Sequence, residues 1–459
     1  MKRILLIISC FILFSNICTA QIFSMKYTLS PTFPNVNEER TRVLKFLQYK
    51  SLVFLDTLDT TYICHVSDYY LSPTPNTFIF HKKRLPLGLV ISDMERIGST
   101  PWYSGSSYNE GVYGRISLSS NYSLNHSVHV FNVPVVNNLR KFTVASNMND
   151  PLHQRMFAIG ETYASGHTRS HIMELDLQGT GITGFEPFPY AQMSDSEYVD
   201  DVTLVGDWVI FTTQDSRSTL SKVNLRMSNI EQMLSGVEID DQWSFMLEPY
   251  EDVIGKVFIT HFSDSDFGVC YIKLDWLKSK YILCVHTINR HDLLNNINSV
   301  ISQEIVLPKG EIIQDITYDE VEKVLIVLLD KDYTQSVFLH VIPYKASPYN
   351  ATYVVSDVND RYFSIDTIQR SDIVLYRAYE AWGGNKGFIQ AFSTNGAVQG
   401  GCYPSAKRRV TIVPLEIKTF TKPIERYQGN RSYTSQELPW PQAIGLRNCF
   451  EMSLKNNEQ

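Results

Sequence analysis

The sequence is poor in cysteine, carries no excess of cationic residues, and lacks a long hydrophobic run after its first 20 residues. It holds 41 basic against 48 acidic side chains, a formal net charge of −7. An acidic surface repels phosphate backbones, which argues against nucleic acid as a partner. No later stretch approaches the roughly 18 apolar residues of a membrane-spanning helix, so we predict no integral membrane segment in the mature chain.

Several catalytic signatures are also absent. The chain contains no nucleophile elbow GxSxG, no P-loop, no EF-hand loop and no HExxH zinc motif. A dispersed Ser/His/Asp triad would leave no such trace, so these absences do not exclude a hydrolase. They leave the sequence without a predicted catalytic residue, metal or cofactor.

Residues 1–20 predict a secretory signal peptide. Lys2 and Arg3 precede an apolar run from Ile4 to Phe14, and Cys18-Thr19-Ala20 places small residues before a cleavage site at Gln21. Cleavage removes two basic residues and leaves a net charge of −9. We therefore expect an exported protein that is periplasmic, bound to the cell surface or secreted.

Five of the 7 cysteines follow the signal, so at least one thiol has no intramolecular partner. A hairpin over 268–286 would place Cys270 and Cys284 opposite each other on one face. A cross-strand disulfide and two small hydrophobic residues in a sheet core are the two alternatives. Cys402 and Cys449 could tie down the C-terminal tail, which would leave Cys64 free.

A repeat of roughly 50 residues runs through the rest of the chain. Its clearest copy, 91–118, contains the strand-length runs ISDMERI, PWYSG and VYGRISL, separated by turn residues. Asp93 to Gly98 aligns with Asp201 to Gly206, and Asp315 opens a third copy in the same way. Seven first strands are expected near residues 43, 93, 140, 201, 247, 315 and 364.

Seven four-stranded repeats of this length predict an all-β fold, a single β-propeller with seven blades. Six or eight blades, or a set of β-sandwiches, are the alternatives. We expect an N-terminal segment over 21–42, the propeller over 43–415, and a C-terminal tail over 416–459 that packs on it and closes it. Short helical insertions are predicted at 228–234, which carries a capping box, and at 292–301, where apolar residues recur at helical spacing.

The phrase ISDMERIG, WYSG and GVYGRISL behind a signal peptide resembles the uncharacterised secreted β-propeller-like proteins of Bacteroidales-type bacteria. The resemblance covers most of the mature chain as weak repeats. It implies a secreted or cell-envelope setting, and it implies no activity and no catalytic residues.

Two constellations could suggest cofactor or metal sites. Gly179 to Gly184 matches GxGxxG, but the following FEPFP opposes the helix that a dinucleotide site needs, so we interpret it as a turn. His167 and His171 are four residues apart, a zinc-binding spacing on a helix, yet they fall in a predicted turn and strand. Neither constellation predicts a site.

Aromatic and acidic residues are the remaining candidates. Aromatics make up 12% of the chain, and exposed rings near turns can stack on sugars. Trp382, Tyr108 and Trp102 are the predicted ligand-binding residues, with packing as the alternative for each. Acidic pairs such as Asp200-Asp201 could do acid–base chemistry if loops brought them together. The aspartates Asp93, Asp201 and Asp315 are expected to hold turn amides at the inner edge of the fold.

No motif specifies an activity. The leading hypothesis is an exported, non-catalytic binding or scaffold protein of the cell envelope, with a glycan, peptide or protein ligand at one face of the propeller. The alternative is an envelope enzyme that acts on polysaccharide or peptide through dispersed acids on blade loops. Fold alone does not separate the two.

Overall fold

The structure is a computed structural model of the chain. It describes residues 25–29, 36–47, 50–57, 61–67, 80–85, 88–97, 100–116, 127–133, 136–144, 155–164, 167–176, 189–192, 197–215, 223–229, 243–248, 252–295, 297, 299–355, 360–367, 373–380, 387–393, 405–415, 417–419 and 434–439. Across these ranges the protein is all-β, and its strands form multiple antiparallel sheets.

Most described strands group into units of four that follow one another along the chain. Unit 1 contains β2 (Val36–Leu47), β3 (Lys50–Thr57), β4 (Thr61–Ser67) and β5 (Phe80–Arg84). Unit 2 contains β6 (Leu89–Ile97), β7 (Thr100–Ser107), β8 (Glu110–Ile116) and β9 (Ser127–Val133). Unit 3 contains β10 (Asn138–Val144), β11 (Arg155–Ala164), β12 (His167–Asp176) and β13 (Pro189–Gln192).

The same arrangement continues through the second half of the chain. Unit 4 contains β14 (Glu197–Val205), β15 (Trp208–Asp215), β16 (Val223–Asn229) and β17 (Trp243–Glu248). Unit 5 contains β18 (Asp252–His261), β19 (Asp266–Asp275), β20 (Lys280–Asn289) and β21 (Ile301–Leu307). Unit 6 contains β22 (Glu311–Asp319), β23 (Val324–Lys331), β24 (Gln335–Val341) and β25 (Tyr349–Val355).

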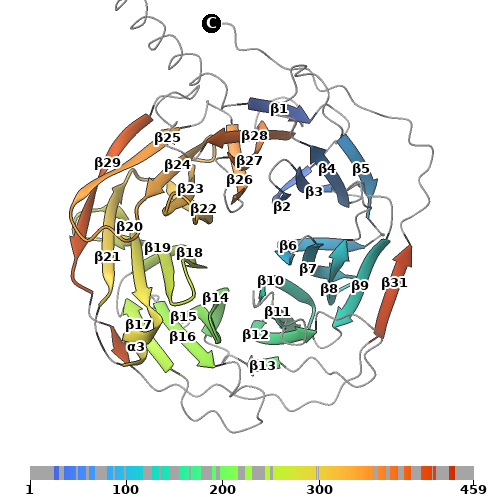
Figure 1. Ribbon diagram of the computed structural model, residues 1–459, viewed down its shortest axis with the longest axis horizontal. Helices are drawn as coiled ribbons and strands as arrows, with labels where there is room; N and C mark the ends of the chain where they lie inside the picture. Colours follow the sequence, from blue (N-terminus) through green and yellow to red (C-terminus); the bar gives the residue numbers. More distant parts are fainter. Residues whose placement is uncertain are drawn as a thin grey trace, which may run out of the picture.

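The last unit takes its outer strand from the other end of the chain. Unit 7 contains β26 (Asp360–Thr367), β27 (Ile373–Glu380) and β28 (Gly387–Ser393), and β1 (Met25–Leu29) pairs antiparallel with β28. The first strand of each unit contacts the first strand of the next, and β26 contacts β2, so the units form a closed ring (Figure 1). We call these seven first strands the inner strands.

The hydrophobic core lies between the units, as a layer at each junction from unit 1 to unit 6 in the described part of the chain. Side chains of a strand alternate between two faces, so each middle strand supplies two layers. In β11, Met156 and Ala158 pack toward unit 2, whereas Phe157 and Ile159 pack toward unit 4. Each sheet is therefore apolar on both faces, which explains why the strands read as nearly continuous hydrophobic runs.

The C-terminal strands run along the outside of the ring. β29 (Ser405–Val413) pairs with both β21 and β25 and joins units 5 and 6 into one nine-stranded sheet. β30 (Lys418–Thr419) then pairs with β17 of unit 4, and β31 (Thr434–Pro439) pairs with β9 of unit 2 (Figure 1). The repeat pattern offers the run from Arg409 to Leu415 as an outer strand of unit 7, but Arg409 to Val413 lie in β29 instead.

The start of the fifth unit and the two predicted helices also differ from the sequence-based expectations. The first strand expected near residue 247 to open the fifth unit is β17, the outer strand of unit 4, and unit 5 opens with β18 at Asp252. The predicted helix over 292–301 is one turn, α3 (Arg290–Leu294), capped by the preceding Asn289, whose Oδ1 accepts a hydrogen bond from Asp292 N. The predicted helix over 228–234 begins inside β16, and its remaining residues lie outside the described ranges.

Of the two alternatives for Cys270 and Cys284, the structure shows buried free thiols in the sheet core and not a cross-strand disulfide. The hairpin turn has four residues, Trp276 to Ser279, so its midpoint falls after Leu277 rather than on it. Cys284 therefore pairs with Tyr271, and Cys270 pairs with Val285. A shift of one residue reverses the faces, so the two sulfurs point into different core layers.

Candidate functional site

The inner strands share an irregularity at the same place. The pairing register with the second strand shifts between Ile91 and Asp93, between Val199 and Asp201, and between Ile313 and Asp315. A β-bulge of this kind redirects the side chain that follows it. The three aspartates aligned in the sequence are thus structurally equivalent, each the first paired residue after its bulge.

Each of these aspartates accepts a hydrogen bond from the next unit's backbone. Asp93 Oδ2 accepts from Phe142 N at 3.2 Å. Asp201 Oδ2 accepts from Ile259 N at 2.9 Å, and Asp315 Oδ2 accepts from Ile365 N at 3.0 Å. The predicted structural role is therefore confirmed, although the amides belong to the neighbouring inner strand rather than to turns.

At two of the junctions that lack such an aspartate contact, a cationic side chain reaches the next unit instead. These are the junction of units 1 and 2 and the junction of units 3 and 4. Arg42 Nε donates to Ser92 O at 2.9 Å. Lys141 Nζ forms an ion pair with Asp201 Oδ1 at 2.8 Å. We call the five residues Arg42, Asp93, Lys141, Asp201 and Asp315 the inner belt. Its charges alternate in sign from unit 1 to unit 4, which favours one neighbour order around the ring.

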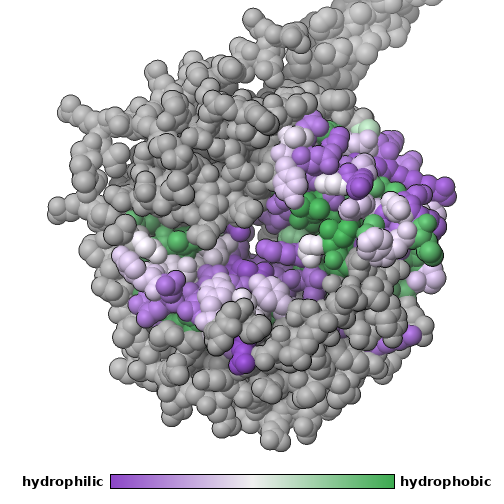
Figure 2. Space-filling view, turned by 180° about the vertical axis from the view of Figure 1, so that it is seen from behind, coloured by the Kyte–Doolittle hydropathy of each residue, from purple (hydrophilic) through white to green (hydrophobic). Residues whose placement is uncertain are grey.

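The inner belt lies in a polar environment at the middle of the ring. Figure 2 shows hydrophilic residues around a hollow there. Burial raises the pKa of Asp93 to about 6, although the charge of Lys141 and the Phe142 amide oppose the rise. Burial also raises the pKa of Glu95 well above its usual range, and the charge of Asp93 adds to the rise. For Lys141, burial lowers the pKa, but the carboxylates of Asp201 and Asp93 outweigh it, so the net shift is upward.

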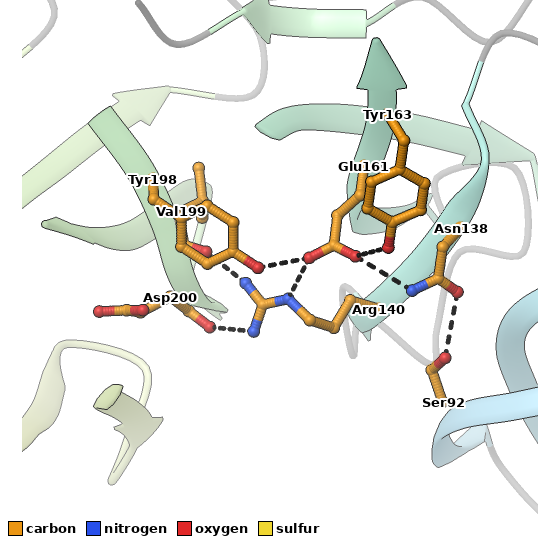
Figure 3. A network of polar contacts seen from close by, with 8 residues as sticks. All are labelled: Ser92, Asn138, Arg140, Glu161, Tyr163, Tyr198, Val199 and Asp200. Carbon is orange, nitrogen blue, oxygen red and sulfur yellow. Dashed lines mark hydrogen bonds and ion pairs between the residues drawn. The ribbon is translucent and has the colours of Figure 1, made fainter. Parts of the chain in front are cut away.

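A second polar cluster surrounds the buried carboxylate of Glu161, which comes from β11 (Figure 3). Its Oε1 accepts from Arg140 Nε at 2.9 Å and from Tyr198 Oη at 2.5 Å. Its Oε2 accepts from Tyr163 Oη at 2.9 Å and from Asn138 Nδ2 at 3.2 Å. Four donors therefore saturate the carboxylate, and we call these five residues the Glu161 network.

The network joins three units. The Arg140 guanidinium also donates to the carbonyl oxygens of Val199 and Asp200 in β14, and lies over the Tyr198 ring at 5.2 Å. On the other side, Ser92 Oγ of unit 2 donates to Asn138 Oδ1 at 3.1 Å (Figure 3). These contacts between units span 46 to 60 positions of sequence, so no local motif indicates them.

A carboxylate beside a tyrosine could act as a base that activates a nucleophile, but this pair is poorly suited to that role. Burial would raise the pKa of Glu161, yet Arg140 and the Tyr198 hydroxyl outweigh it and lower the pKa. Burial raises the pKa of Tyr198, and the negative charge of Glu161 adds to the rise. A weak base beside a weak acid favours a fixed hydrogen bond over proton transfer.

The network reaches the surface at Tyr163, and a second tyrosine, Tyr108, is exposed nearby. Tyr163 is 56% exposed, and Tyr108 in the turn between β7 and β8 is 71% exposed. Asn137 lies between them: its Nδ2 donates to Asn109 O at 3.0 Å, and its Oδ1 accepts from Tyr163 N at 2.7 Å. We call Tyr108, Asn137 and Tyr163 together the tyrosine site.

The Tyr108 ring has a fixed support. A Cβ built on Gly88 would lie 2.8 Å from Cζ of Tyr108, so the ring packs directly on the glycine backbone. Gly88 has φ +80, a conformation that glycine adopts without strain. Tyr108 itself has φ 48, in a tight turn. One side of the ring is therefore supported while the side chain stays largely exposed.

The three predicted ligand-binding residues have different surroundings. Tyr108 is at the surface, as expected. Trp102 is only 4% exposed and packs in the core layer between units 2 and 3, so the structure gives it the packing role instead. The reason is the position in β7, where side chains face a neighbouring sheet rather than solvent. Trp382 lies outside the described residues.

The described residues offer no metal centre, because no group of three or more His, Cys, Asp and Glu is placed to hold an ion. His171 lies in β12, where its Nε2 is 3.1 Å from Thr162 Oγ1, and burial lowers its pKa to about 4. The glycine motif at 179–184 lies outside the described ranges. Within those ranges, no helix is long and apolar enough to cross a membrane.

No family model matches the sequence, and no curated protein matches it. Among solved structures it is similar to the WD40 domain of Toxoplasma gondii coronin, with 8% identity, 82% of this chain and 87% of that chain covered, and a TM-score of 0.42. The Vanderwaltozyma polyspora Nup133 β-propeller domain has 10% identity, coverages of 81% and 97%, and a TM-score of 0.40. Chaetomium thermophilum Raptor has 11% identity, coverages of 82% and 29%, and a TM-score of 0.44.

These matches amount to a distant structural resemblance to β-propeller domains. At such low TM-scores and identities they carry no argument about activity, ligand or partner. The function must therefore be inferred from the residues of this chain.

Proposed function

We propose that the protein is an exported, non-catalytic binding protein of the cell envelope that binds a glycan at the tyrosine site. We further propose that its ring is a single seven-bladed β-propeller, with one blade for each unit. The ring of inner strands supports the blade assignment, and the signal peptide predicted over residues 1–20 supports export.

One observation carries the proposal: two exposed tyrosine rings lie beside fixed amide groups on one face. Tyr108 rests on Gly88, and Asn137 connects its turn to Tyr163. Sugar rings bind to proteins by stacking their C–H faces on aromatic rings and by exchanging hydrogen bonds with planar polar side chains. Pre-ordered groups of this kind lower the entropic cost of binding.

The acidic groups support a non-catalytic role. Asp201 and Asp315 are hydrogen-bonded to backbone amides, and Glu161 accepts four hydrogen bonds. Asp200, from the predicted acidic pair Asp200-Asp201, accepts from Val257 N at 3.2 Å and from Gln214. Carboxylates that hold neighbouring units together have little freedom to move protons.

The test is a glycan-array and polysaccharide pull-down screen on the mature chain, residues 21–459, with reducing-sugar release followed on the same samples. We expect binding without release. Substituting Tyr108→Ala with Tyr163→Ala should weaken binding at least about tenfold, since each stacking contact is worth about 1 kcal/mol or more.

Tyr333→Ala is the matched control, because Tyr333 is 69% exposed on unit 6, away from the tyrosine site. This variant should bind glycan as the unaltered chain does. Binding that survives loss of both tyrosines would contradict the site, and the absence of any glycan binding would shift the proposal to a peptide or protein ligand.

A second candidate function is an envelope enzyme that acts on polysaccharide or peptide. One observation favours it: Asp93 has a pKa raised to about 6 and interacts with the charge of Glu95, whose pKa burial also raises. A carboxylic acid with a raised pKa can serve as a general acid. Release of reducing sugar or peptide that disappears in Asp93→Asn would support the enzyme over the binding protein.

A further inference from the structure

A hairpin tip on unit 5 exposes two large hydrophobic residues. Trp276 is 65% exposed and Leu277 is 98% exposed, in the turn between β19 and β20. The tip is ordered by Asp275, whose Oδ1 accepts from Lys278 N at 3.1 Å and whose Oδ2 pairs with Lys278 Nζ at 3.0 Å. A leucine held in water by an ordered turn forgoes the burial that its side chain would gain elsewhere.

Two neighbouring connections lie at the same end of the strands. Pairing of Tyr281 with Leu307 brings the connection between β21 and β22 beside the hairpin. Asp332 N donates to Gly310 O at 3.4 Å, which places the next turn against that connection. This turn carries Tyr333, 69% exposed. We call the three turns, 276–280, 308–310 and 331–335, the tip surface.

The tip surface is basic although the whole chain is acidic, with a net charge of −7. Lys278, Lys280 and Lys309 are exposed there. Its acidic residues are fewer: Asp332, and Asp275, which is paired with Lys278, at the edge of the hairpin. The turns at the opposite end of units 4 to 6 are acidic instead, with Asp207, Asp264, Glu320 and Glu322.

We propose that the tip surface docks the protein on an anionic phospholipid bilayer, with Trp276 and Leu277 inserted among the headgroups. Tryptophan favours the membrane–water interface, and an aliphatic tip gains by entering the acyl boundary. Lysines beside the tip are attracted to anionic lipid. A glycan would leave Leu277 without a matching contact, because an aliphatic side chain offers no ring face for stacking. The attachment is peripheral and reversible, and it is independent of the tyrosine site.

The experiment is co-sedimentation of the mature chain with vesicles of phosphatidylcholine, with and without about 30% phosphatidylglycerol. We expect binding to the anionic vesicles only, weakened in about 0.5 M NaCl because salt screens the lysines. Tryptophan emission should shift to shorter wavelength on binding, since Trp276 leaves water. Trp276→Ser with Leu277→Ser should lower the partition coefficient at least about tenfold.

Ile297→Ser is the matched control, because Ile297 is 54% exposed at the opposite end of the strands. It should bind vesicles as the unaltered chain does. Absence of sedimentation with anionic vesicles, or equal binding by the tip variant, would overturn the proposal. Binding to acidic polysaccharide but not to vesicles would also overturn it. The tip variant should keep glycan binding, so failure of the membrane proposal is distinguishable from failure of the proposed function.

Discussion

Asp93 combines two opposing requirements in one side chain. Its carboxylate holds the Phe142 amide across the junction of units 2 and 3, at 3.2 Å. Burial of the same group disfavours its charge and raises its pKa from 3.8 to about 6, against the influence of Lys141. The contact that joins the units is therefore made by a group whose ionisation costs folding free energy near neutral pH.

The sign of the pH effect follows from that shift. Below about pH 4, Asp93 is protonated in both states, and between about pH 4 and 6 it is protonated only in the folded state. Stability contributed by Asp93 is therefore present at low pH and is lost as pH rises to about 6. Relative to Asp93→Asn, the unaltered chain should lose roughly 2 kcal/mol of unfolding free energy between pH 4.5 and 7.5. Urea unfolding of both proteins at the two pH values measures this difference.

The unaltered chain must be compared with Asp93→Asn because the stability contributed by buried histidines changes with pH in the opposite direction. Burial lowers the pKa of His286 to about 3, and the charge of Lys273 adds to the shift. A histidine kept neutral in the fold loses stability as pH falls below about 6.5. Both proteins share this term, so it cancels. A difference that stays constant with pH would contradict the assignment to Asp93.

At the scale of elements, β29 pairs with the outer strands of two consecutive units, β21 of unit 5 and β25 of unit 6. Its Arg408 forms two hydrogen bonds with the carboxylate of Glu311 in β22, at 2.6 and 2.7 Å. The guanidinium also lies 4.3 Å from the centre of the Tyr353 ring. Glu311 is fully buried, so Arg408 is the partner that neutralises its charge.

Removing Arg408 should therefore cost more than a surface substitution. Arg408→Ala leaves the Glu311 carboxylate buried without its cation, and we expect a loss of about 3–5 kcal/mol in unfolding free energy. Lys407→Ala, exposed on the same strand, should cost less than about 0.5 kcal/mol. Guanidinium unfolding of the two variants is the measurement. Equal losses would show that β29 is held by its backbone pairing rather than by this ion pair.

Elements were more predictable than the borders between units. The strands of units 2 and 6 follow from short runs rich in aromatic and β-branched residues, because such side chains suit a pleated surface. The start of unit 5 was displaced because β17 and β18 are separated by only three residues, a gap that also occurs within units. The length of this connection therefore did not mark the border between units 4 and 5. The border is set by strand pairing, because β17 pairs with β16 and β18 pairs with β19.

At the scale of the whole molecule, the ring is closed by strands from both ends of the chain. β1 completes unit 7 by pairing Met25 to Leu29 with Ala391 to Gly387 of β28. A ring closed by its own N-terminus gains cooperativity, because the chain that leads into unit 1 is then paired within the sheet of unit 7, in addition to the contact between β2 and β26.

Deleting residues 21–30 should weaken this closure. The edge of β28 would lose several backbone hydrogen bonds of about 1 kcal/mol each, and we expect a lower melting temperature with self-association through the open edge. Calorimetry and size-exclusion chromatography measure the two effects. A chain that lacks residues 450–459 controls for truncation itself. An unchanged melting temperature and a monomeric deletion variant would contradict the role of β1.

The sequence by itself determined the β-strands, their grouping by about 50 residues and the equivalence of Asp93, Asp201 and Asp315, because these depend on local composition and spacing. Only the tertiary structure decided what those residues contact. The donors to Glu161 come from three strands, the partner of β28 comes from the other end of the chain, and the separation of Cys270 from Cys284 follows from a four-residue turn. Contacts between sheets depend on strand register and on ring closure, and the amino-acid sequence carries little information about either.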